Sequence, residues 1–268
     1  MINSFLSFAA IIGYIAAGVL VAVRLSSGAD KAAASKTALF LLGGIALALH
    51  AVVLYQDIFL SQGLNFGIVN AVSLLSWFIV LLLLLIAASK PIENLGIAIF
   101  PIAALALILG VMFPSEHILA DDNFSLKFHI LISFVAYSVF AFAALQAILL
   151  AIQDKHLHSR QPGGFVRLLP PLRTMEEMLF QLIGLGFLLM SLSLFSGFVY
   201  LEDVFAQHLV HKTFLSMVAW VVFVVLLWGR WRFGWRGKRA IRATLFGFTV
   251  LLLAYIGSKV VMEVLLGK

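Results

Sequence analysis

The sequence predicts an all-α protein, a polytopic membrane bundle of about eight transmembrane helices. The 268-residue chain is 63% hydrophobic and only 11% charged, and its mean hydropathy is +1.11. Long apolar runs are separated by short charged loops, which is the pattern of a membrane protein. Each run must be helical, because lipid offers the backbone no hydrogen-bond partners.

Each of the eight apolar runs is close to the ~20 residues that cross the hydrocarbon core of a bilayer. We predict spans at residues 4–23, 37–56, 66–88, 95–113, 126–152, 178–200, 210–228 and 243–265. The longest loop follows the fifth run and contains Pro170 and Pro171, which cannot lie inside a helix. Thr174 and Glu177 have the spacing of a capping box that would restart the helix. Residues 1–268 are expected to form a single integral membrane domain.

Basic residues are distributed unevenly between the two sides of the membrane. All but four of the 18 Lys and Arg residues follow the first, third, fifth and seventh spans, and the exceptions are Lys127, Lys212, Lys259 and Lys268. The positive-inside rule therefore places both termini outside the cytoplasm. The basic cluster at 230–242 lies beside Trp228, Trp231 and Trp235, and this combination is typical of a membrane stop signal with an aromatic belt. The expected partner of these residues is the lipid bilayer, and no nucleic-acid partner is expected.

Several kinds of chemistry lack the residues that they need. The chain has no cysteine, which excludes disulfides, thiol redox chemistry and thiolate metal sites. Nothing resembles a phosphate-binding loop, a nucleophile triad or a pair of carboxylates deep in the membrane. The chain is therefore not expected to be an enzyme.

Histidines are the polar side chains most suggestive of function. Five of the seven map toward the outer face, and three of these, His50, His129 and His211, lie within predicted spans at similar depth. Ionisable groups inside spans are costly, so they are candidates for function. His129 and His211 also lie near helix N-termini, where the positive helix end disfavours imidazolium and neutral imidazole can bind a metal.

Lys127 and Lys212 lie beside two of these histidines and could pair with carboxylates. The combination fits a haem whose iron is held by His129 and His211, with its propionates near the lysines and His50 in a supporting role. It fits equally a proton or metal path of a transport or ion-homeostasis subunit. The residues alone leave both interpretations open.

Several stretches together resemble a known family. They are residues 65–70 with Ser76 and Trp77, 126–129 with Ala136 and Tyr137, 183–190 with Ser196 and Gly197, Lys212 and Thr213 with Trp220, and 234–239. This pattern resembles the CcsA/CcmC-type cytochrome c assembly proteins, in their HemX-like branch. The resemblance covers most of the chain from about residue 60 to 268.

The resemblance implies haem handling in a bacterial inner membrane, with a partner from cytochrome c biogenesis or haem synthesis. His129 matches a haem-ligand position of the family, His211 lies close to the other half of that site, and His50 matches by position only. The family's Trp-rich external motif is missing here, and residues 228–230 read Trp-Gly-Arg where CcsA proteins carry a histidine before an arginine. A HemX-like role, tuning haem synthesis or binding haem as an accessory, is therefore an alternative to haem delivery.

The charge distribution generates a test of topology. Reporter fusions at Arg160 and Arg236 should behave as cytoplasmic, and fusions at Asp121 and Asp203 should behave as external, because basic loops stay inside. A reversed pattern at any two of the four positions would contradict the predicted orientation.

Overall fold

The computed structural model describes residues 2–27, 32–61, 63–114, 117–119, 124–158, 169–200 and 207–257, without the side chains at several helix ends, 207–211 among them. In this part of the chain, eight helices are long and apolar enough to cross a membrane. The predicted all-α membrane bundle is confirmed. The chain divides into two compact units, one containing residues 1–120 and 159–170 and the other the remainder.

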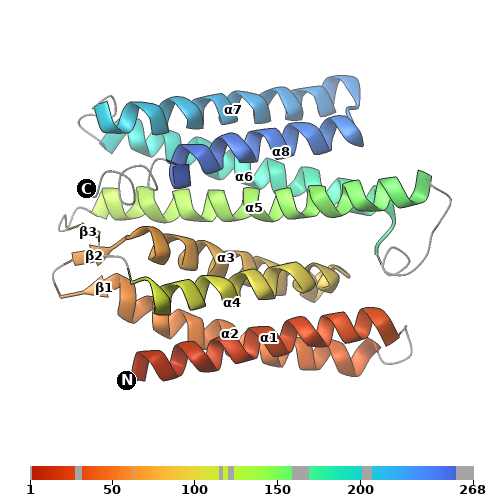
Figure 1. The fold of residues 1–268 in the computed structure, drawn as a ribbon. Coiled ribbons are helices and arrows are strands. Elements are labelled where there is room, and N and C mark those ends of the chain that lie inside the picture. The colour runs from red at the N-terminus through yellow and green to blue at the C-terminus, as the bar shows by residue number, and fades with distance from the viewer. Residues whose placement is uncertain are drawn as a thin grey trace. The chain divides into compact units, whose positions relative to one another are not determined.

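The first unit is a ring of four helices, in which each helix packs on the next and the fourth returns to the first (Figure 1). They are α1 (Ile2–Ser27), α2 (Ala32–Ile58), α3 (Ile68–Ser89) and α4 (Gly96–Met112). On α1, Ala10, Tyr14 and Ala17 are fully buried, whereas Ile12 and Ile15 are exposed. Two small side chains and one hydrogen-bonded tyrosine face the interior while large aliphatic side chains face outward, as expected when lipid is the solvent.

An ion pair with a buried carboxylate connects two helices of this unit at their basic end. Lys36 on α2 lies 2.7 Å from the carboxylate of Glu93, which belongs to a short 3₁₀ helix, Glu93–Leu95, before α4. Glu93 is only 4% exposed, so its charge requires the partner that Lys36 supplies.

A small antiparallel sheet closes the opposite end of the first unit and was not predicted. Its strands are β1 (Phe59–Leu60), β2 (Gly63–Asn65) and β3 (Ile118–Leu119), in the order β1-β2-β3. The buried Asn65 side chain organises the connection, because its Oδ1 accepts hydrogen bonds from the backbone N–H groups of Gly67 and His117. Strands of two or three residues leave no alternation in a sequence from which to predict them.

The second unit is also a ring of four helices (Figure 1). They are α5 (Phe124–His158), α6 (Leu172–Tyr200), α7 (Gln207–Phe233) and α8 (Lys238–Leu252), the last continued by a π-helical turn over Leu253–Gly257. Phe140 and Phe223 are stacked at the centre with ring centroids 4.1 Å apart, and both are fully buried. Gly186 admits this stack, since a Cβ there would lie 3.0 Å from the Phe140 ring.

The predicted restart of the helix at a Thr174 capping box is wrong. α6 begins at Leu172, directly after the proline pair, and the Pro171 carbonyl accepts the backbone N–H of Met175. The fixed φ of proline suits the start of a helix, so the helix begins at the first residue after the proline pair. Glu177 pairs instead with Arg173, one turn earlier, at 3.0 Å.

Helix packing in the first unit generates a stability prediction. A Cβ at Gly13 would lie 2.9 Å from the Cβ of Ala46, whereas a Cβ at Gly44 would meet no atom within 4 Å. Gly13→Ala should force α1 and α2 apart and lower the free energy of unfolding by about 1–3 kcal/mol. Gly44→Ala, the matched control, should be neutral or slightly stabilising. Unfolding of the purified protein in detergent measures both, and equal effects would contradict this packing.

Candidate functional site

His129 lies in the second turn of α5 and is partly buried against α6. Its Nδ1 is 2.9 Å from the hydroxyl oxygen of Ser196, and the ring also hydrogen-bonds the backbone of Ser193. α5 begins at Phe124, so the sequence correctly predicted a helix N-terminus close to this histidine. Two contacts from the neighbouring helix therefore fix the orientation of the imidazole.

The hydrogen bonds around Ser196 determine which nitrogen of His129 carries the proton. The Ser196 hydroxyl donates to the carbonyl of Ser193 at 2.8 Å. Since a hydroxyl has one hydrogen, the Ser196 oxygen accepts from Nδ1–H of His129. A neutral ring with its proton on Nδ1 carries its lone pair on Nε2, and histidine binds a metal in this state while its other nitrogen is held by a protein group.

Gly197 provides the space in which this ring lies. A Cβ at that position would be 3.1 Å from Cε1 of His129 and 3.9 Å from Nε2. Such a contact is tighter than usual, and the ring would have to shift by a few tenths of an ångström to accommodate it. The pair Ser196 and Gly197 thus supplies both the acceptor and the clearance for His129.

Within the second unit, a row of hydroxyl groups extends from His129. Ser133, one turn further along α5, donates to the His129 carbonyl and lies 2.6 Å from the Ser193 hydroxyl. Tyr137, a further turn along, hydrogen-bonds Ser216 on α7. These side chains border a cavity of about 30 Å³, which exceeds the ~10–15 Å³ that one water requires.

His50 is in the first unit, where hydrogen bonds engage both of its ring nitrogens. Nδ1 is 3.1 Å from the hydroxyl of Tyr14 on α1, and Nε2 is 2.9 Å from the hydroxyl of Ser73 on α3. The side chain is fully buried. In this arrangement neither nitrogen faces a ligand, so the geometry favours a supporting role in which His50 joins three helices.

The remaining predicted residues are placed less completely. His211 lies in the first turns of α7, but its side chain is outside the described residues, as is that of His208. Lys127 and Lys212 are partly buried near the starts of α5 and α7. His156 is exposed and its Nδ1 bonds the carbonyl of Ile152; it lies within α5, which continues to His158, beyond the predicted end of this span at residue 152. Within the described part of the chain, no three His, Asp or Glu side chains gather as a metal-binding group.

Sequence comparison identifies the family. Residues 38–266 match the cytochrome c assembly protein family. The chain belongs to this family. The match includes α5, α6 and α7, and therefore His129 and its serine partners. The family resemblance predicted from the sequence is confirmed.

Individual relatives agree with this assignment. The chain is 33% identical to the inner membrane protein YpjD of Escherichia coli K12 over 228 residues, covering 82% of this chain and 85% of that protein. It is 35% identical over 141 residues to an uncharacterised 28.8 kDa protein of Azospirillum brasilense, covering 52% of each. It is 23% identical to the cytochrome c biogenesis protein CcsA of Chlamydomonas reinhardtii, covering 52% of this chain and 38% of that protein. No solved structure matches the chain significantly.

Sequence reasoning missed the partners of both described membrane histidines. Ser196 and Gly197 were noticed only as part of the family pattern, and Ser133 has the i+4 spacing that could have linked it to His129. Tyr14 and Ser73 are separated from His50 by 36 and 23 residues. Nothing in a single sequence indicates that three such positions meet.

The His50 hydrogen bonds can be tested with a pair of matched variants. Tyr14→Phe removes one partner of a fully buried ring and should cost about 1–3 kcal/mol of stability. Tyr55→Phe is the control, because Tyr55 is 66% exposed, and it should change stability little. Denaturation in detergent gives both values, and no difference between the two variants would argue against the buried hydrogen bond.

Proposed function

We propose that this chain is a haem-binding, non-enzymatic membrane protein of cytochrome c assembly or haem biogenesis. The observation that carries the proposal is the contact between Nδ1 of His129 and the Ser196 hydroxyl, because a neutral ring protonated at Nδ1 has its metal-binding lone pair on Nε2. We place the protein in a bacterial inner membrane with both termini external, in agreement with the charge distribution and with the name of its YpjD relative.

The residues around His129 fit the coordination of a haem iron. A ligating imidazole needs its second nitrogen held by a hydrogen-bond acceptor, and Ser196 meets that requirement. Haem is the molecule that this protein binds or passes on, and its iron supplies the coordination chemistry.

The second axial ligand in this proposal is His211, and the propionates would be neutralised by Lys127 and Lys212. Lys127 precedes His129 by two residues and Lys212 follows His211 directly. His50 is assigned a structural role, because its ring nitrogens are already engaged by Tyr14 and Ser73. Residues 1–268 would act as a single membrane domain.

The alternative, a transport or ion-homeostasis subunit, is favoured by one observation. The hydroxyls of Ser133, Ser193 and Ser216, with Tyr137, form a polar row that begins at His129. Along the described part of α5, however, this row reaches the stacked and fully buried rings of Phe140 and Phe223. Apolar rings in van der Waals contact carry neither protons nor cations, so haem binding remains the first proposal.

The ligand assignment can be tested by replacing His129. In protein purified from cells supplied with haem, His129→Ala should abolish the low-spin spectrum or convert it to a high-spin spectrum, because one axial ligand is lost. Ser196→Ala keeps the ligand but loses its hydrogen-bond partner, and should lower haem affinity about tenfold or more. Absorption spectra and haem-to-protein ratios measure both effects.

His156→Ala is the control, since His156 is exposed and its Nδ1 lies 2.9 Å from the Ile152 carbonyl within its own helix; the spectrum of this variant should equal that of the wild type. Unchanged spectra in both His129→Ala and His211→Ala would remove the haem-ligand proposal. Wild-type protein that binds no haem would favour the transport alternative.

A further inference from the structure

The turn between α7 and α8 is folded back onto α7 by specific contacts. The indole of Trp235 lies over Gly229, where a Cβ would be only 2.3 Å from the ring. The backbone N–H of Trp235 donates to the Gly229 carbonyl at 3.2 Å, and the Arg230 guanidinium donates to the Trp235 carbonyl at 3.3 Å. The same guanidinium is 4.6 Å from the centre of the Phe180 ring on α6. The turn therefore has a defined shape.

A carboxylate of α6 holds the other side of this turn. Glu176 accepts the backbone N–H of Gly237 with one oxygen and pairs with Nε of Arg236 through the other, at 3.3 Å. Its side chain is only 8% exposed. Gly237 has a positive φ of 54°, which glycine adopts readily. α8 consequently starts at Lys238, earlier than the predicted residue 243.

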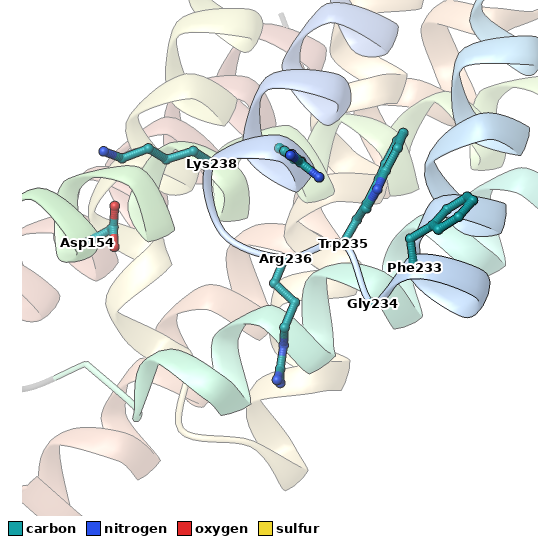
Figure 2. A pocket seen from close by; sticks show the side chains of 7 residues that line it. Asp154, Phe233, Gly234, Trp235, Arg236 and Lys238 are labelled. Atoms are coloured by element: carbon teal, nitrogen blue, oxygen red, sulfur yellow. The ribbon is translucent and has the colours of Figure 1, made fainter.

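The folded turn forms an open pocket of about 420 Å³ at the basic end of the second unit. Three cations, two aromatic rings and one carboxylate line it: Arg236, Lys238, Arg239, Phe233, Trp235 and Asp154. Figure 2 shows Lys238 and Asp154 at one side of the pocket, Phe233 and Trp235 at the other, and Arg236 between them.

The charges lining this pocket favour an anion. Glu176 already engages Arg236, which leaves Lys238 and Arg239 opposite the single carboxylate of Asp154. Lys238 is also the first residue of α8, where the helix dipole adds positive potential. The balance is positive even when both carboxylates are counted.

The pocket is continuous with a surface suited to lipid. Phe233 both lines the pocket and is 66% exposed. Trp228 and Trp231, on the preceding turns of α7, are 56% and 77% exposed. Aromatic side chains of this kind lie at the boundary between headgroups and acyl chains. This surface therefore suits an anion with an attached acyl chain, which would lie beside the aromatic rings.

We propose that this pocket binds the phosphate group of an anionic phospholipid headgroup, at the end of the unit that the charge distribution predicts to be cytoplasmic. Basic pockets on that side of membrane proteins can hold such headgroups. The phosphate contacts Lys238 and Arg239, while the acyl chains lie along Trp231 and Phe233. Free phosphate has the same anionic group but no acyl chain that could contact the aromatic surface.

The test compares lipids of equal chain length on the full-length protein in detergent. Native mass spectrometry would measure binding of phosphatidylglycerol, phosphatidylcholine and inorganic phosphate to the wild type, to K238Q/R239Q and to R232Q. The wild type should prefer phosphatidylglycerol, and K238Q/R239Q should bind it about tenfold more weakly or worse. R232Q is the matched control, because Arg232 belongs to the same basic cluster but does not line the pocket.

Three outcomes would overturn the proposal. One is equal wild-type affinity for phosphatidylglycerol and phosphatidylcholine. Another is a loss in R232Q as large as that in K238Q/R239Q, which would indicate general surface charge. The third is displacement of the lipid by inorganic phosphate at comparable concentration, which would assign the pocket to free phosphate. The unfolding temperature of each variant without added lipid shows whether the fold is retained.

Discussion

Hydrogen bonding inside the membrane is the constraint on which the rest of this structure depends. Lipid cannot satisfy a polar group, so each membrane-spanning run is a helix, and buried polar side chains are stabilised by hydrogen bonds to protein partners. His50 is joined to Tyr14 and Ser73, and His129 is joined to Ser196. In both cases hydroxyl side chains on neighbouring helices supply the bonds, so the polar residues that complicate membrane insertion also determine which helices pack together.

The helices and their order could be predicted from the sequence because the apolar runs have the length that a bilayer requires. The ends of the helices depended on contacts that a sequence does not display. α6 begins at Leu172 because the proline pair ends there, while Glu177, expected in a cap, is drawn to Arg173. α8 begins at Lys238 because Glu176, from another helix, accepts the backbone N–H of the preceding residue, Gly237.

The candidate site was predictable to a similar extent. The position of His129 near a helix N-terminus follows from span length and charge, and family resemblance marked it as a ligand. Its tautomer follows only from Ser196, which lies 67 residues further along the chain. For His50, hydrogen bonding to hydroxyl groups leads to a different role. Two hydroxyls engage both ring nitrogens, so neither nitrogen is available to a ligand. Depth in the membrane could be read from the sequence, whereas the identity of the neighbours could not.

The close approach of Gly197 to His129 has a consequence for the interpretation of related chains. A Cβ at residue 197 would lie 3.1 Å from Cε1 of the imidazole, and the adjacent serine bears on its tautomer. A relative that keeps the histidine but carries alanine in place of this glycine would have to displace the ring by a few tenths of an ångström, and a larger residue would add further atoms to this contact. The serine–glycine pair is therefore a criterion for sorting homologues: it separates chains able to present the same nitrogen from those that merely retain a histidine.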